Sequence, residues 1–289
     1  ATGLNRSHMP RLVEGSDASG RLRPELAQRW GMTSAPVVAG GGGDNAASAC
    51  GTGAVKPGSA FVSLGTSGVL FVTNDRFSPN VGSAVHAFCH AVPDTWHQMG
   101  VILSATDSLN WLSKVLRRPA QELTGLVTDL KRPSDVMFMP YLGGERTPHN
   151  DVAIRGGFFG ISHDTDEAEL THAVLDGVAF ALMDCLAALT SAGTKVERVT
   201  AVGGGSRSRT WLEIIATVLG VTVDLPQDGD FGAALGAARL GQAAADGYSD
   251  ALFSAPPMAA AIDPNPALRS AYGEAYARWR KLYPAVKEI

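Results

Sequence analysis

The sequence has few cysteines and none of the spacings in which cysteine or histidine usually binds a metal. Its three cysteines, Cys50, Cys89 and Cys185, are far apart and form no CxxC pair. The seven histidines form no HExxH pattern. These spacings indicate neither a disulfide framework nor a zinc site. They predict small buried thiols in a reducing compartment.

Long apolar runs and a strong net charge are also missing. No uncharged stretch reaches the roughly 18 apolar residues of a membrane span, and Asp184 interrupts the apolar segment 178–189. We recognise no secretory signal. A net charge of −4 gives no reason to expect a nucleic-acid surface. We therefore expect a cytoplasmic protein of one large or two modest domains, with no membrane and no nucleic-acid partner.

Several common nucleotide-binding and hydrolase motifs are absent. The sequence has no Walker A motif and no GxSxG elbow. The turn that contains Gly203 and Gly205 has Ser208 where the third glycine of GxGxxG would stand, and no acidic residue follows at the ribose-binding distance. The patterns of a P-loop, a dinucleotide-binding fold and an α/β-hydrolase are therefore not met.

What the sequence does have is glycine-rich turns after apolar stretches. In residues 37–47, an apolar strand passes through four glycines to Asp44 and Asn45, at the start of a small-residue helix over 46–54. Glycines let a ligand approach the backbone closely, and a helix N-terminus offers free N–H groups. Asp44 is either a simple helix N-cap or a carboxylate held at a cleft to accept a proton or bind a metal.

A second turn lies at the tip of a predicted hairpin. Strands over 60–64 and 69–73 flank the sequence Gly65-Thr66-Ser67-Gly68. This tip is either a plain turn or a phosphate loop, in which backbone N–H groups and two hydroxyls donate to anionic oxygens.

A third turn follows the apolar strand over 199–202. It reads Gly203-Gly204-Gly205-Ser206 and leads into a helix predicted over 208–219. It is either a tight β–α turn or a place where a nucleotide meets the backbone. The repeated arrangement of strand and glycine-hydroxyl turn favours a nucleotide phosphate held between two lobes.

The remaining segments complete an α/β pattern. In a hairpin over 86–100, His86, His90 and His97 are either metal ligands or, as we expect, residues that alternate on a strand exposed on one face. Residues 1–35 are a polar lead-in, with a short helix over 24–30. We predict helices over 103–116, 166–189, 232–245 and 268–283, strands over 136–142, 156–161 and 221–225, and a Pro/Ala loop from Pro256.

These motifs, in this order, resemble the carbohydrate kinases of the FGGY family, and the xylulokinases among them. The resemblance runs from about residue 9 to about residue 283. Residues 145–149 and 86–90 favour a xylulokinase over a glycerol kinase. The matching stretches are 41–47, 63–68, 141–150, 203–208 and 232–238, with a second family signature over 156–176.

The resemblance implies an α/β protein with the actin-like ATPase (RNase H-like) fold, in which two lobes flank a cleft. It implies that the γ-phosphate of ATP is transferred to D-xylulose to give D-xylulose 5-phosphate, with Mg²⁺ accompanying ATP. In this interpretation Asp44 is the base that takes the proton from the attacking sugar hydroxyl, and Asn45 lies beside it on the sugar. The nucleotide-binding residues would be Gly65, Thr66 and Ser67 at the β- and γ-phosphates, Gly204 and Gly205 at the adenosine, and Ser208 or Arg209 nearby.

The family begins with an N-terminal lobe that carries an early Asp-x-Gly-Thr phosphate loop, and no such loop precedes Asp44. We therefore expect residues 1–56 to be the end of that first lobe and residues 57–289 to be the C-terminal nucleotide-binding lobe. We expect this chain alone to be inactive. Because most sugar contacts and metal ligands belong to the first lobe, we name no metal ligand.

Two alternatives remain open at this point. The first is an actin-like ATP-binding module or pseudokinase that does not phosphorylate a sugar. The second is a kinase for another sugar or polyol, such as ribulose, gluconate or glycerol. The resemblance also admits a homodimer.

Overall fold

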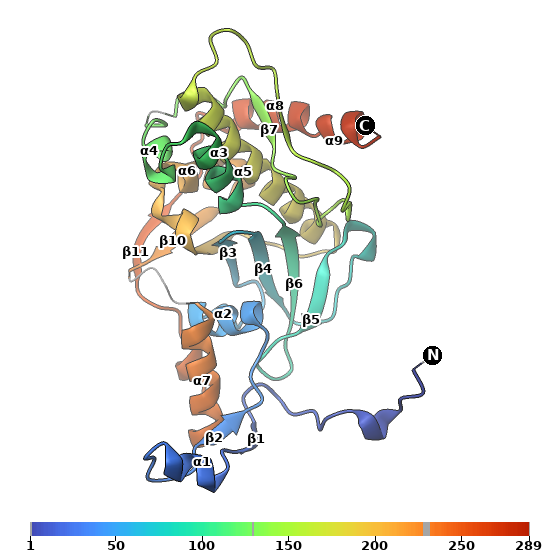
Figure 1. Ribbon diagram of the computed structural model, residues 1–289, viewed down its shortest axis with the longest axis vertical. Helices are drawn as coiled ribbons and strands as arrows, with labels where there is room; N and C mark the ends of the chain where they lie inside the picture. The colour runs from blue at the N-terminus through green and yellow to red at the C-terminus, as the bar shows by residue number, and fades with distance from the viewer. Residues whose placement is uncertain (1, 129, 228–231, 289) are drawn as a thin grey trace.

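A seven-stranded mixed sheet is the centre of the fold (Figure 1). The structure is a computed structural model that describes residues 2–128, 130–227 and 232–288. The strands lie in the order β11-β10-β9-β3-β4-β6-β5, which confirms the α/β class. Their bounds are β3 Ala60–Leu64, β4 Gly68–Asn74, β5 His86–Cys89, β6 Trp96–Ile102, β9 Arg198–Val202, β10 Thr222–Pro226 and β11 Met258–Ile262.

Three parallel strands form the middle of this sheet. Strand β9 lies between β3 and β10, with Val62 beside Ala201 and Val223 beside Val199. The predicted hairpin of β3 and β4 is confirmed as an antiparallel pair, in which Leu64 faces Gly68. Because β3 and β9 run in the same direction, the turns that follow them leave the sheet at the same edge.

One face of the sheet carries the main core. Apolar side chains of β3 and β4, including Val62 and Leu70, pack in one cluster with the long helix α5. Figure 1 shows α3, α5 and α6 together on this side. The helices here are α3 Thr106–Leu116, α4 Ala120–Thr124, α5 Glu167–Ser191, α6 Arg209–Leu219, α8 Arg269–Trp279 and α9 Leu282–Val286.

Helix α5 is long and apolar enough to cross a membrane by length and composition alone. Most of its apolar stretch is nevertheless buried inside the protein. It begins where the Asp166 carboxylate accepts a hydrogen bond from Glu169 N at 2.9 Å. It is a core helix, and α6 and α8 pack against it.

The opposite face of the sheet is covered by α2 Asp44–Thr52. Ala49 of this helix packs in a second cluster with Phe61 and Phe71 of the sheet. Helix α7 Ala233–Asp246 packs on α2 and extends away from the sheet (Figure 1). The first 56 residues are thereby joined to a helix from near the end of the chain.

Three of the sequence predictions require correction here. The thiol of Cys89, which was expected to be buried, is exposed. The predicted Pro/Ala loop is wrong over 258–262, where β11 pairs antiparallel with β10 at the edge of the sheet. Within the polar lead-in, β1 Ala18–Arg21 pairs with β2 Val37–Ala39, and no strand was predicted for β1. The smaller remaining elements are η1 Arg6–His8, α1 Pro24–Arg29, η2 Val81–Ser83, the pair β7 Met137–Met139 and β8 Gly157–Phe159, η3 Gly204–Arg207 and η4 Asp250–Phe253.

Candidate functional site

The Gly65-Thr66-Ser67 turn between β3 and β4 is held from behind by the start of α3. The carbonyl of Gly65 accepts hydrogen bonds from Thr106 N at 2.9 Å and from Thr106 Oγ1 at 2.7 Å. The carbonyl of Thr66 accepts one from Ala105 N at 2.8 Å. Among the described residues, nothing accepts from the N–H groups or hydroxyls of Thr66 and Ser67. The turn therefore presents donors on its open side, as an anion-binding turn does.

The turn after β9 lies directly against the first one. Gly203 has φ +88°, and a Cβ atom there would lie 2.8 Å from the carbonyl oxygen of Leu64. A Cβ atom on Gly205 would lie 2.7 Å from the Leu64 Cβ. Both positions therefore favour glycine: Gly203 lies against the backbone at the start of the first turn, and Gly205 lies against packed side chains. Two of the three predicted glycine turns are thus brought together.

A cavity of about 530 Å³ opens beside the second turn, and Thr106, which holds the first turn, also lines it. This volume falls within the range of small-molecule sites. The cavity combines apolar walls with a few polar groups. Its lining residues come from α3 (Thr106, Leu109 and Asn110), from α4 and its end (Ala120, Gln121 and Thr124) and from the second turn and α6 (Gly204, Gly205, Arg207, Ser208 and Trp211).

Ser208 and Arg209 differ in position although they are neighbours in sequence. Ser208 lines the cavity, and its hydroxyl caps α6 by accepting from Trp211 N at 3.3 Å. Arg209 lines a different cavity, and its Nε donates to Glu213 Oε1 at 3.0 Å. Of this pair, only Ser208 belongs to the wall beside the glycine turns.

Asp44 and Asn45 lie on the other side of the sheet, in the first turn of α2. The N-cap is Gly43, so the interpretation of Asp44 as the cap is wrong. The exposed Asp44 carboxylate accepts from Asn45 N at 2.8 Å and from Asn45 Nδ2 at 3.2 Å. In the described ranges no hydrogen bond or ion pair joins Asp44 or Asn45 to either glycine turn.

Two of the three histidines of the hairpin are buried: His90 and His97 are 5% and 4% exposed. The expected strand with one exposed face is wrong for β6, where four successive residues from His97 are buried, whereas β5 is exposed at its end. Burial lowers the pKa of His90 to about 4 and that of His97 to about 3. Both rings are therefore neutral at pH 7. Across the described ranges, no group of three or more His, Cys, Asp or Glu side chains is placed to hold a metal.

Sequence reasoning missed the residues of α3 and α4 that line the cavity. Thr106 and Asn110 are one helical turn apart and share a face of α3. Both are polar, so no hydrophobic periodicity marks this face in the sequence. Gln121 and Thr124 come from a five-residue helix that was not predicted. Only the packing of α3 and α4 beside the glycine turns identifies these four residues as part of a site.

Comparison with known proteins gives consistent matches. Residues 60–245 match the FGGY family of carbohydrate kinases, C-terminal domain. The chain is 43% identical to xylulose kinase of Escherichia coli, over 98% of this chain and 59% of that protein. It is 46% identical to xylulose kinase of Klebsiella pneumoniae, over 86% of this chain and 52% of that protein. The chain therefore spans little more than half the length of these relatives.

Solved structures agree with the sequence relatives. A xyloylose kinase from Brucella ovis superposes with a TM-score of 0.95 at 58% identity, over 99% of this chain and 60% of that one. The xylulose kinase from Rhodospirillum rubrum superposes with a TM-score of 0.85 at 27% identity, over 99% of this chain and 59% of that one. The expected actin-like ATPase fold is confirmed, and this chain belongs to the FGGY family of carbohydrate kinases.

Proposed function

We propose that this chain is the nucleotide-binding part of an ATP-dependent sugar kinase that phosphorylates D-xylulose to D-xylulose 5-phosphate. The observation that carries the proposal is the meeting of two glycine turns beside a cavity of about 530 Å³. Membership of the family and the relatives named xylulose kinase support the chemistry and the choice of sugar. The enzyme would be cytoplasmic, and the division into 1–56 and 57–289 belongs to the same proposal.

In this proposal the base and ribose of ATP occupy the cavity next to Gly204, Gly205 and Ser208. The N–H groups and hydroxyls of Thr66 and Ser67 then donate to the phosphates. Their free donors fit an anion because nothing else in the described ranges uses them. Mg²⁺ would accompany the phosphates and neutralise their charge, and no residue is assigned to it.

Asp44 is proposed as the general base and Asn45 as its neighbour on the sugar. Phosphoryl transfer needs mainly positioning and charge stabilisation, together with one oriented base. The exposed carboxylate of Asp44 at the start of α2 is available for this task. The Asp44→Asn variant tests this role directly.

The test measures ADP release by the natural gene product that contains this chain, with ATP·Mg²⁺ and D-xylulose in a panel of sugars. We expect release with D-xylulose, and we expect Asp44→Asn to reduce it by several orders of magnitude while ATP binding persists. A variant with near-normal turnover would remove Asp44 from the mechanism. Release with ribulose, gluconate or glycerol instead would change the substrate and keep the kinase.

A nucleotide-binding module without kinase activity is the other candidate. Its signature would be a folded gene product that binds ATP and releases no ADP with any sugar. The free donors of the Gly65-Thr66-Ser67 turn suit either function. The same assay therefore separates the two.

A further inference from the structure

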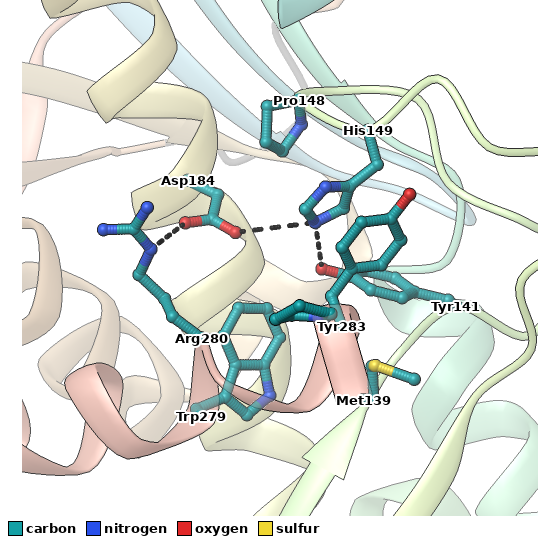
Figure 2. Close-up of a pocket in the computed structure, with 9 residues that line it drawn as sticks. Met139, Tyr141, Pro148, His149, Asp184, Trp279, Arg280 and Tyr283 are labelled. Carbon is teal, nitrogen blue, oxygen red and sulfur yellow. Dashed lines mark hydrogen bonds and ion pairs between the residues drawn. The ribbon is translucent and has the colours of Figure 1, made fainter. Parts of the chain in front are cut away.

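A second cavity, of about 250 Å³, lies between α5, the C-terminal helices and the segment after β7 (Figure 2). Its described lining residues are all different from those of the cavity beside the glycine turns. Its volume is that of roughly eight water molecules. It is therefore large enough for a small organic molecule. Its wall consists of Met139, Tyr141, Pro148, His149, Asp184, Trp279, Arg280, Tyr283 and Pro284.

One carboxylate oxygen in this wall is left without a hydrogen-bond donor. Asp184 is only 7% exposed. Its Oδ1 accepts a hydrogen bond from the Tyr276 hydroxyl and lies 3.7 Å from Arg280 Nε. Its Oδ2 lies 4.0 Å from His149 Nε2, which is beyond hydrogen-bond distance. Asp184 lines the cavity, so a hydroxyl group placed inside the cavity could donate to this open oxygen.

His149 does not act as a cationic partner for Asp184. Burial lowers the pKa of His149 to about 4, so the ring is neutral at pH 7. Its Nε2 lies 3.2 Å from the Tyr141 hydroxyl, and its ring stacks on Tyr283 with centroids 3.6 Å apart. Figure 2 shows His149 and Asp184 directed toward each other.

The charges of the wall define the kind of ligand. The guanidinium of Arg280 lies beside Asp184 and offsets its charge, so the wall has no net attraction for a cation. The open Oδ2 of Asp184 disfavours an anion. A neutral ligand remains, and it must both donate to Asp184 and accept from Arg280. Hydroxyl groups do both.

The other side chains of the wall suit the carbon skeleton of such a ligand. Trp279 and Tyr283 contribute aromatic surface, and Met139 contributes an adaptable apolar one. A cavity of apolar walls with a few placed polar groups is typical of small-molecule sites.

We propose that this cavity binds a small uncharged polyol or sugar, with hydroxyl groups that donate to Asp184 Oδ2 and accept from Arg280. The site is separate from the proposed phosphotransfer site, and the proposal does not depend on phosphotransfer. The ligand class follows from one free acceptor, one neighbouring donor and aromatic walls.

The test uses xylitol as the probe and methyl-¹³C-methionine labelling of this chain as the readout. Met139 lines the cavity, and its methyl signal can be assigned with Met139→Leu. We expect a saturable shift of that signal as xylitol is added. Asp184→Asn should weaken xylitol binding by at least about tenfold, because a hydrogen bond to a charged group is lost.

The control is Asp164→Asn, the same change at an exposed carboxylate. Asp164 does not line this cavity, so binding should be unchanged. If Asp184→Asn does not fold, Arg280→Ala decides, because that side chain is 64% exposed and should weaken binding without unfolding the protein. An absent Met139 shift, or equal shifts in wild type and folded Asp184→Asn, would overturn the proposal.

Discussion

At the scale of single residues, two polar atoms in the described part of the interior have no hydrogen-bond partner: His97 Nδ1 and Glu145 Oε2. Each belongs to a group whose pKa is shifted by burial, downward for His97 and upward for Glu145. A shifted pKa makes folding stability depend on pH. The free energy of unfolding should therefore rise with pH because of His97 and fall with pH because of Glu145.

Replacing His97 should reduce the loss of stability in acid. Its folded pKa of about 3 lies below the ordinary 6.5, so only the unfolded state takes up a proton as the pH falls below 6.5. Through this residue, wild type should therefore lose about 2 kcal/mol of its free energy of unfolding between pH 7 and pH 5. His97→Phe, which keeps a ring stacked on Phe71, should lose less between pH 7 and pH 5 in urea titrations. Equal losses in the two proteins would contradict the shifted pKa. His90, buried beside it, remains in both.

Glu145 should tolerate glutamine and not alanine. Burial raises its pKa to about 8, so the carboxyl is protonated at pH 7, and its contribution to stability falls as the pH rises from about 4.5 to 8. Glu145→Gln keeps an acceptor for Leu103 N and Arg146 N and should be at least as stable as wild type at pH 7. Glu145→Ala leaves both donors unpaired and should cost about 2–4 kcal/mol in urea titrations.

Leu103 precedes the residues that hold the Gly65-Thr66-Ser67 turn, so Glu145→Ala should also weaken nucleotide binding. Unchanged stability and binding in Glu145→Ala would show that this buried carboxyl does not support the turn.

At the scale of elements, the crossing of α2 and α7 depends on glycine. A Cβ atom on Gly236 would lie 1.7 Å from the carbonyl oxygen of Ala47, and one on Gly51 would lie 2.5 Å from the carbonyl oxygen of Gly232. The two helix backbones are therefore nearly in contact. No other residue type fits without separating the helices.

The matched pair Gly236→Ala and Gly241→Ala tests this crossing within one helix. Gly236→Ala should destabilise the protein by about 1–3 kcal/mol, because backbone must move. A Cβ atom on Gly241 meets no atom within 4 Å, so Gly241→Ala should be neutral or stabilising by up to about 1 kcal/mol through helix propensity. Thermal unfolding of both variants would measure the difference, and equal effects would contradict close helix contact.

The sequence predicts those helices and strands whose own residues show a local pattern of secondary structure. The hairpin of β3 and β4 has β-rich arms and a glycine tip, and α6 follows a strand and a capping serine, Ser208. Strand β11 has neither signal: it follows two prolines, contains three alanines, and exists because β10 offers an edge to pair with. Pairing across such a distance in sequence leaves no local pattern.

The candidate site divides in the same way. The two touching glycine turns were visible in sequence because glycine itself marks a close approach. Thr106 and Asn110 were not, because ordinary polar residues on a helix become a wall only when another element faces them. The neighbouring glycines marked Asp44 as a candidate in the sequence. Its position relative to the two touching turns could not be predicted from local sequence.

At the scale of the whole molecule, the cavity beside the glycine turns is lined by two segments of this chain, 106–124 and 204–211, which pack together beside the sheet. We therefore predict that the chain alone binds ADP. Saturating ADP should raise its melting temperature, with about 2.7 kcal/mol of stabilisation at a hundred times the Kd. Calorimetry or thermal unfolding would measure the effect.

Gly204→Val provides the control for ADP binding. A Cβ atom there meets no atom within 4 Å, so the variant should fold with an unchanged melting temperature. Its side chain should occupy the cavity that Gly204 lines and remove the ADP shift. Stabilisation by ADP that persists in Gly204→Val would place the nucleotide elsewhere.

The order of the strands also has a consequence for the newly made chain on the ribosome. Strand β3 can pair with β4 as soon as both emerge, but its other neighbour, β9, is far later in the chain. Until β9 is translated, the hydrogen-bonding edge of β3 stays open, as does the surface that the later helices cover. Such an edge invites pairing with other nascent chains. Chaperones that cover exposed strands therefore matter most for this protein in the interval between synthesis of β3 and synthesis of β9.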